Sequence, residues 1–242
     1  MRRRPPSAFS LVELVLAMLA GMTVLLVAAG WFGTTGERCG RVQGGVAARR
    51  ELRFAVAEWR ADLAAAMPKA GVVPGESGAA GDRLGFFLLQ APGKQSEKGR
   101  IGDLCGVVYQ VRDRVEDGRT MRCLMRGLRE SAEAYPALKV HALDSLLAPR
   151  ETDEPVAFGV VRFEARPVVR GAAGEWVDWS AGDPSVRPEA VAWRIEVARP
   201  ELAKRLATPQ DWDALAGERR TSDERAIEGQ AGVTAFGHEG AR

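Results

Sequence analysis

Few side chains in this sequence stand where they could do chemistry together. The three cysteines, Cys39, Cys105 and Cys123, form no CxxC pair, and the two histidines, His141 and His238, lie far from them in the chain. Zinc-finger and haem-attachment spacings are therefore absent. Buried or oxidised cysteine is a commoner fate than a reactive thiol, and His141 has the setting of a half-exposed strand residue. We assign none of these five residues to catalysis.

The acidic residues and the glycines show no catalytic pattern either. Asp178, Asp183 and Glu189 form a loose group that could contact Ca²⁺, but their spacing matches no calcium-binding loop. The sequence also lacks GxSxG, HExxH, the P-loop and the glycine fingerprint of dinucleotide-binding folds. We therefore predict that the protein is not an enzyme and that it holds no metal and no cofactor.

Glu13 stands at the start of a long apolar run. Residues 14–32 contain no ionisable side chain, and as a helix they span about 28 Å, close to the ~30 Å hydrocarbon core of a bilayer. A carboxylate costs on the order of 2.5–3.5 kcal/mol near the bilayer centre and less near its edge. Glu13 therefore either lies at headgroup depth, beside the positive end of the helix dipole, or has a partner inside an apolar assembly.

The residues around Glu13 resemble the class III signal of type IV pilins and type II secretion pseudopilins. A basic leader, MRRRPPSA, ends in the small residue Ala8, and Glu13 is the fifth residue counted from Phe9. In that family the prepilin peptidase cuts before an aromatic residue and methylates the new amino terminus. The resemblance implies cleavage between Ala8 and Phe9, N-methylation of Phe9 and a role for Glu13 in filament assembly. The family usually has Gly before the cut, so Ala8 is a departure that keeps the residue small.

The chemistry of such an assembly follows from charge burial. A cationic amine at Phe9 of one subunit can neutralise the Glu13 carboxylate of a neighbour inside an apolar helical bundle, which compensates for lost hydration. The resemblance implies three partners: the prepilin peptidase, other pilin-like subunits and inner-membrane lipid. It also implies a cytoplasmic amino terminus and a periplasmic carboxy-terminal domain, although five arginines that follow the apolar run compete with the leader for orientation, Arg38, Arg41, Arg49, Arg50 and Arg53.

Two simpler interpretations of the amino terminus stay open. An ordinary secretory signal peptide also has a basic start, an apolar stretch and small residues such as Val27, Ala28 and Ala29 before its cut, although the run is long for one and contains Glu13. A plain single-pass anchor would keep the whole run. In either case the protein would be a tethered or exported periplasmic binding domain with no filament role.

The charge balance argues against a nucleic-acid partner. The chain of 242 residues has 34 basic and 32 acidic side chains, and 46% of its residues are hydrophobic, enough for a folded core. Without Arg2, Arg3 and Arg4, 31 basic groups face 32 acidic ones. Such a body has no general positive field that would attract phosphate.

A second helical pattern follows the apolar run. Val56, Trp59, Leu63 and Met67 recur at helical spacing, and Pro68 ends the pattern. We predict five regions: a cleaved leader (1–8), a transmembrane helix (9–32), an amphipathic continuation (33–68), a β-rich periplasmic head (69–200) and a polar, partly disordered tail (201–242). Little in 217–242 could be buried, so we expect that part to be loose.

Strand patterns fill the head. They cover 84–89, 107–112, 119–125, 156–166, 175–179 and 190–198. Asp117-Gly118 reads as a tight hairpin turn, which would place Arg112 opposite Cys123 and would keep Cys105 away from Cys123. The predicted fold is therefore α+β and pilin-like: a long amino-terminal helix, transmembrane in one half and amphipathic in the other, packed on an antiparallel sheet.

The order of several short motifs is similar to that of J-type minor pseudopilins. They are Asp62-Leu63 at the end of the long helix, a Val-Tyr-Gln-Val strand at 108–111, the tryptophans 176 and 179, and an Arg-Pro-x-Ala-Val entry into the last strand at 187–191. The same order is similar to prepilin-like proteins of the Verru_Chthon cassettes, particularly cassette protein C. The resemblance implies a minor pseudopilin-like subunit that supports type II-like protein secretion.

Overall fold

The computed structural model describes residues 11–67, 71–75, 81–90, 92–116, 118–139, 145, 148–180, 186–217 and 226–237, with the backbone alone for 29–41. The chain divides into two compact units, Met1–Gln43 and Gly44–Arg242. Helix α1 (Leu11–Ala65) forms the described part of the first unit and opens the second. All the other described helices and strands belong to the second unit.

The second unit contains two antiparallel sheets. The first has the strand order β1-β2-β3-β4-β5 and comprises β1 (Val72–Pro74), β2 (Leu84–Leu89), β3 (Leu104–Glu116), β4 (Arg119–Arg129) and β5 (Glu154–Phe158). The second has the order β7-β6-β8-β9 and comprises β6 (Val160–Arg170), β7 (Trp176–Asp178), β8 (Ala190–Ala198) and β9 (Ile227–Ala235). The remaining described helices are short: η1 (Pro92–Lys94), α2 (Ser131–Lys139), α3 (Pro200–Ala203) and α4 (Pro209–Gly217).

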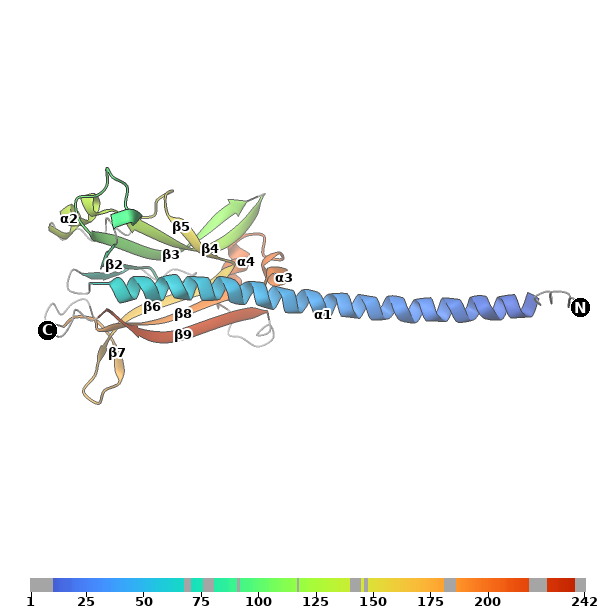
Figure 1. Ribbon diagram of the computed structural model, residues 1–242. Helices are drawn as coiled ribbons and strands as arrows, with labels where there is room; N and C mark the ends of the chain where they lie inside the picture. Colours follow the sequence, from blue (N-terminus) through green and yellow to red (C-terminus); the bar gives the residue numbers. More distant parts are fainter. Residues whose placement is uncertain are drawn as a thin grey trace, which may run out of the picture. The chain divides into compact units, whose positions relative to one another are not determined.

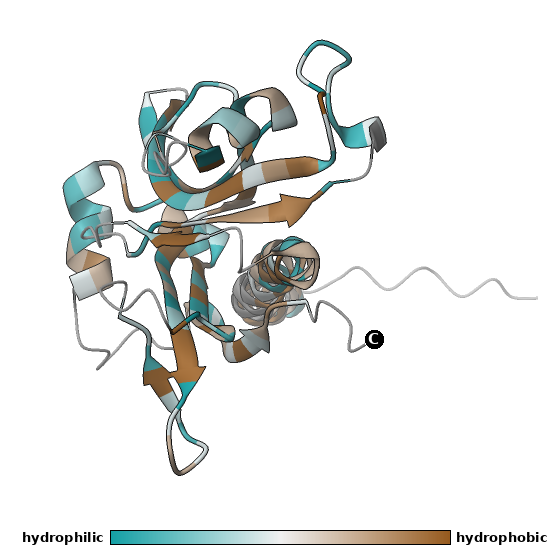
Figure 2. Cartoon of the chain, turned by 90° about the vertical axis from the view of Figure 1, so that its left-hand side faces the viewer, coloured by the Kyte–Doolittle hydropathy of each residue, from teal (hydrophilic) through white to brown (hydrophobic). Residues whose placement is uncertain are grey.

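The part of α1 that belongs to the second unit carries a buried apolar face at helical spacing. Its buried residues recur three or four positions apart, at Ala48, Leu52, Ala55, Val56, Trp59 and Leu63. They share one hydrophobic core with residues of both sheets. Figure 1 shows this part of α1 running alongside strands of both sheets, and Figure 2 shows hydrophobic residues, in brown, on the strands beside the helix. The predicted α+β fold, with a helix packed on antiparallel strands, is confirmed.

Trp59 lies at the centre of this core. Its ring meets Tyr109 of β3 edge-on at 4.8 Å between centroids, Phe163 of β6 at 5.5 Å and Phe86 of β2 at 6.0 Å. Edge-to-face pairs of this kind contribute about 0.5–1.5 kcal/mol each beyond the area that they bury. One side chain of α1 therefore contacts strands of both sheets and holds them on the same helix.

β3 and β4 form the predicted tight hairpin. Glu116 pairs with Arg119, so two residues make the turn. Gly118 has φ +73°, the left-handed conformation that two-residue hairpin turns need, while Asp117 lies outside the described residues. The register follows from the turn, as expected, and the two strands are longer than their sequence patterns indicated.

The strand predicted over 156–166 is in fact two strands. β5 ends at Phe158 and β6 begins at Val160, and they belong to different sheets. Gly159 between them has φ +71°, a backbone conformation that residues with a Cβ rarely adopt. The apolar alternation continues through this point, so the pattern gives no sign that the chain changes sheets.

The polar tail predicted over 201–242 is folded in its described part, and the expectation that 217–242 is loose does not hold for the described residues 226–237. α3 and α4 fold onto the head, and Trp212 of α4 is fully buried. β9 pairs with β8 along its whole length, from Ile227 opposite Ala198 to Ala235 opposite Ala190. The sequence of β9 is poor in the residues that favour strands. Its strand conformation is stabilised by pairing with the edge of β8.

α1 ends at Ala65, three residues before its predicted end. Ala66 bridges to Leu88 of β2, and the backbone N–H of Met67 donates to the carbonyl oxygen of Phe87 at 2.7 Å. The backbone of Ala66 and Met67 therefore pairs with β2, and the helix ends before Pro68.

Candidate functional site: the apolar helix and its anchorage in the head

Apart from Glu13 and Thr23, the described segment Leu11–Ala28 of the first unit presents an apolar helix surface on every side. Leu11–Ala28 has a mean hydropathy of 2.5 over 18 residues, and none of this segment is buried within the structure. Its large side chains are exposed around the whole helix, with Leu11 at 78% and Val27 at 74%. By length and composition, this is one helix that could cross a membrane. An all-round apolar helix needs a nonaqueous neighbour, either lipid or other helices.

The hydroxyl group of Thr23 inside this segment is satisfied locally. The Thr23 hydroxyl is within hydrogen-bond distance of two backbone carbonyl oxygens of its own helix, at 2.8 Å from Ala20 and 3.2 Å from Leu19. A hydroxyl that returns to its own backbone does not need water. Gly21 has no atom near the position where a Cβ would lie, so this face is open to a neighbouring helix. The segment therefore suits an apolar environment in both its side chains and its backbone.

Glu13 lies in the first turn of α1 and is exposed. The amino-terminal end of a helix favours a carboxylate by about 0.3–1 kcal/mol, because the unpaired backbone N–H groups there carry partial positive charge. Ala8 and Phe9, the predicted cleavage site, lie outside the described residues. The cleavage, the methylation and the assembly role of Glu13 therefore stay predictions.

In the head, the end of α1 is fixed to the first sheet by a buried charge network. Asp62 accepts hydrogen bonds from the Tyr109 hydroxyl at 2.6 Å and from Nε and Nη2 of Arg126 at 2.6 and 2.9 Å. Asp62 is 6% exposed and Tyr109 is fully buried. A two-point arginine–carboxylate contact fixes direction as well as distance. The network therefore sets both the rotation of α1 and its position along β3 and β4.

The titration of the network follows from its burial. Burial raises the pKa of Tyr109 well above its usual value, and the charge of Asp62 raises it further. Burial alone would lower the pKa of Arg126, but its hydrogen bonds to Asp62 and the charge of that carboxylate raise it above the usual value. The tyrosine therefore stays neutral and the arginine stays charged. The sequence analysis named Asp62 and Tyr109 only as members of short motifs and did not predict this contact. An acidic residue next to the apolar stripe of Trp59 and Leu63 was the sequence feature that could have indicated a buried ion pair.

A second buried pair holds the segment that leads into β5. Asp153 is completely buried at its side chain and lies 2.6 Å from Nη1 of Arg129, with a further hydrogen bond from the backbone N–H of Arg150 at 2.9 Å. Burial by itself raises the pKa of Asp153, but the hydrogen bonds from Arg129 and Arg150 and the charges of Arg129 and Arg112 hold it below the ordinary value. Sequence reasoning missed this pair, because its partners are 24 residues apart and lie on no shared motif.

The two cysteines of the head are buried and far from each other in the register. Cys123 pairs with Arg112 across the hairpin, as predicted, and Cys105 pairs with Leu88 of β2. No disulfide joins these two cysteines. Burial, and then the charge of Glu130, raises the pKa of the Cys105 thiol to about 11. The nucleophilic thiolate is therefore scarce at neutral pH.

The acidic residues that could have contacted Ca²⁺ are not brought together in the described part of the chain. Asp178 pairs with Arg166 at 2.8 Å, with both side chains more than half exposed. Glu189 lies just before β8, and Asp183 and His141 lie outside the described residues. Among the described residues, no three acidic, histidine or cysteine side chains gather around a common point.

No family model matches the chain, and no curated protein matches it. Among solved structures, the chain is similar to a type IV-like pilin from Thermus thermophilus, with 16% sequence identity and a TM-score of 0.44. The alignment covers 78% of this chain and 95% of that one. The α+β fold follows from the strand pairing and the core of the chain itself.

Proposed function

We propose that the protein is a pilin-like subunit that assembles with other pilin-like subunits through its amino-terminal helix. The observation that carries this proposal is the exposed apolar segment Leu11–Ala28 with Glu13 in its first turn. The same helix continues in sequence into a half that packs on antiparallel sheets. A subunit built in this way has an apolar part for lipid or for a helical bundle and a folded part for the aqueous side.

The finer role follows from the resemblance of the amino terminus. The prepilin peptidase cuts between Ala8 and Phe9 and methylates Phe9, and the mature helix sits in the inner membrane with its amino terminus in the cytoplasm and the head in the periplasm. On assembly, the Phe9 amine of one subunit pairs with the Glu13 carboxylate of the next. The pair neutralises both charges inside the apolar bundle, so it favours the assembled state. The subunit is then a minor pseudopilin that supports a short filament in a type II-like secretion system.

The mass of the mature amino-terminal peptide from the membrane fraction tests the processing. A peptide that begins with N-methylated Phe9 is expected. A start near Gly30 would instead mean an ordinary signal peptide, and an intact leader would mean a plain anchor. Both of these results point to a tethered or exported binding domain, and both contradict the pilin proposal.

Glu13→Ala tests the assembly step. The substitution removes the carboxylate and keeps the apolar length, so we expect membrane insertion to be unchanged and co-isolation with other pilin-like subunits to be lost. Leu16→Ala, one turn further along the helix, is the matched control and should retain assembly. Carbonate extraction measures insertion, and capture from detergent-solubilised membranes measures assembly. An unchanged complex with Glu13→Ala would exclude the pairing with Phe9.

A further inference from the structure

The charged residues in the packed part of α1 are sorted by sign around the helix. Between Gly44 and Ala65 there are four arginines, Arg49, Arg50, Arg53 and Arg60, and three acids, Glu51, Glu58 and Asp62. At about 100° per residue the arginines share one side of the helix and the acids share the other. We call these sides the basic flank and the acidic flank.

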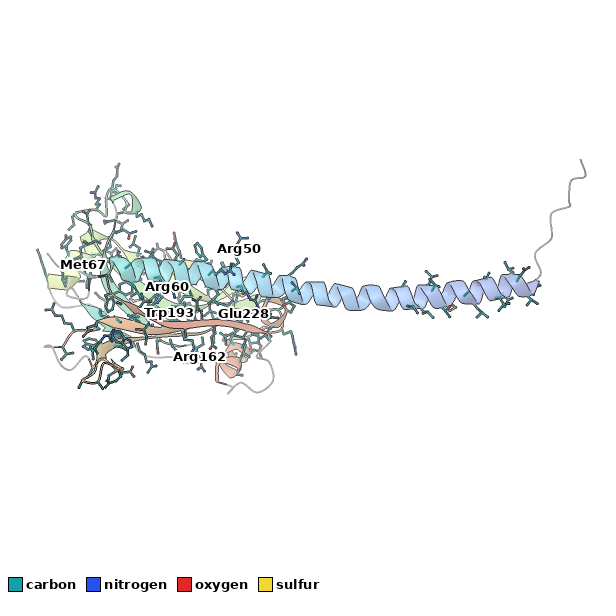
Figure 3. All side chains as sticks on the ribbon, turned by 60° about the horizontal axis from the view of Figure 1, so that its bottom comes forward. Arg50, Arg60, Met67, Arg162, Trp193 and Glu228 are labelled. Carbon is teal, nitrogen blue, oxygen red and sulfur yellow. The ribbon has the colours of Figure 1, made fainter. Side chains whose placement is uncertain are left out.

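Contacts to the sheets confirm this division. On the basic flank, Arg49 Nε lies 3.1 Å from a carboxylate oxygen of Glu228 on β9, and the Arg60 guanidinium lies 5.4 Å from the centre of the Trp193 ring on β8. Figure 3 shows Arg60, Trp193 and Glu228 on the side of α1 that faces the second sheet, with Arg50 projecting outward from the helix. The basic flank therefore borders the second sheet.

The acidic flank borders the first sheet. Glu51 accepts a hydrogen bond from the backbone N–H of Phe158 on β5 at 3.4 Å, and Asp62 accepts those of Arg126 on β4. Helix and sheet are thereby joined at two points of the acidic flank. Between these two points, residues of α1 and β5 line a cavity.

A groove of about 800 Å³ lies along the acidic flank, between α1, β4, α2 and β5. Its lining includes the apolar side chains of Phe54, Leu128 and Val156. Phe54 is 56% exposed, although it belongs to the helix that carries the core. An exposed aromatic ring in a groove of this size is a typical anchor point for another protein surface.

The charge left over in the groove is negative. Glu58 and Glu154 line it, and within the described part of the chain neither carboxylate has an ion-pair or hydrogen-bond partner. Two of its three cations, Arg126 and Arg150, are already paired with carboxylates of the same chain, which leaves Lys94. The groove therefore suits an apolar surface that carries positive charge.

The chain itself carries such a surface on the opposite flank of α1. Arg50 and Arg53 are exposed, and in the described structure neither has a partner. Val46 lies one turn before Arg50 and is 61% exposed. The basic flank thus combines apolar and positive side chains in the way that the groove requires.

We infer that the groove binds the basic flank of α1 from a second copy of this chain, with Arg50 and Arg53 of one copy opposite Glu58 and Glu154 of the next. Because the two surfaces differ, the contact is heterologous and passes from copy to copy, without closing into a twofold pair. The inference rests on the proposed function, which places the copies side by side in one membrane.

Disulfide cross-linking of the full chain in membranes tests the contact. Two differently tagged copies carry Cys39→Ser, and one also carries Arg53→Cys while the other carries Glu58→Cys. Mixed-tag dimers are expected on mild oxidation. The matched control replaces Glu58→Cys by Val115→Cys, at a residue of β3 that is 76% exposed and remote from the groove lining, and should give none. Equal yields from both pairs, or no dimer from either, would overturn the inference.

Charge reversal separates this contact from a change in folding. Glu58→Arg with Glu154→Arg gives one variant, and Arg50→Glu with Arg53→Glu gives the other. Each alone should lower capture of its own second copy about tenfold, a loss that corresponds to about 1.4 kcal/mol. Mixed together, the two should recover capture, because each then meets an oppositely charged surface. Failure to recover would contradict the inference. The mass of the Phe9 peptide from the same membranes shows independently whether the proposed function fails.

Discussion

At the scale of single residues, buried charges add direction to the apolar contacts that hold α1 on the first sheet. Apolar contacts tolerate a small rotation of a helix, but the two-point contact between Asp62 and Arg126 does not. Its desolvation cost is repaid only when all three partners, with Tyr109, are in place. The network therefore favours one docking of the helix over nearby alternatives.

Asp62→Asn tests this role. The substitution removes the charge that compensates Arg126, which is largely buried, so we expect the free energy of unfolding of the full chain in detergent to fall by about 3–5 kcal/mol. The control is Asp178→Asn in the exposed pair with Arg166, which should cost less than about 1 kcal/mol. Chemical denaturation followed by tryptophan fluorescence gives both values. Similar losses in the two variants would show that the buried network has no special weight.

Asp153 makes stability depend on acid pH. Its pKa in the folded chain lies below the ordinary value of 3.8, because Arg129 and the backbone N–H of Arg150 outweigh the effect of burial. A carboxyl group with a lowered folded pKa contributes stability that is complete above the unfolded pKa and is lost as pH falls through the folded pKa. We therefore expect the free energy of unfolding to decrease as pH falls below about 4. Asp153→Asn should show a flatter pH profile than wild type between pH 5 and 2. If the free energy of unfolding of Asp153→Asn depends on pH as steeply as that of wild type, other carboxyl groups cause the acid sensitivity.

At the scale of elements, local patterns predicted the strands better than they predicted which sheet each strand joins. The bounds of β2 and β8 and the register of the β3–β4 hairpin agree with the sequence, because alternation and turn chemistry are local properties. The split between β5 and β6 depends on a single φ angle at Gly159. The strand β9 depends on pairing with β8, over thirty residues earlier in the chain. Neither the split between β5 and β6 nor the strand β9 could be predicted from the residues near it in the chain.

Gly159→Val tests the switch between the sheets. A Cβ at this position would lie 3.4 Å from the carbonyl oxygen of Ala198, an ordinary contact, so the expected cost comes from the backbone conformation. A left-handed conformation costs a residue with a Cβ about 1–2 kcal/mol, and a β-branched one is at the upper end. Gly159→Asn should cost less, because Asn tolerates this conformation best among such residues. Unfolding free energies that rank Val equal to or above Asn in stability would exclude this explanation.

The candidate site shows the same division between local and long-range information. The apolar run and Glu13 can be read directly from the sequence, because a membrane-length helix is a property of consecutive residues. The groove beside Phe54 cannot be read in this way, since its walls come from five elements, α1, η1, β4, α2 and β5, and the lining residues lie up to about a hundred positions apart in the chain. The sorting of charge around α1 is visible in the sequence only once the buried face of the helix is known.

At the scale of the whole molecule, the two units are built for different surroundings. Apart from Glu13 and Thr23, the exposed side chains of Leu11–Ala28 are apolar, whereas the second unit has its own core of two sheets and a helix. The core residues contributed by α1 begin at Ala48, inside the second unit. The first unit therefore contributes no described residue to the core of the head.

From this division we expect the head to fold without the apolar segment. Gly44–Arg242, exported behind an ordinary cleavable signal, should be soluble in the periplasm and unfold cooperatively, because every α1 residue of the core is retained. Its free energy of unfolding should lie within about 1 kcal/mol of that of the head in the full chain, since no residue of Leu11–Ala28 is buried within the structure. Fractionation and chemical denaturation measure the two properties. A head that pellets with membranes or loses cooperativity would mean that the apolar helix contributes to its fold, and the two-unit description would then be wrong.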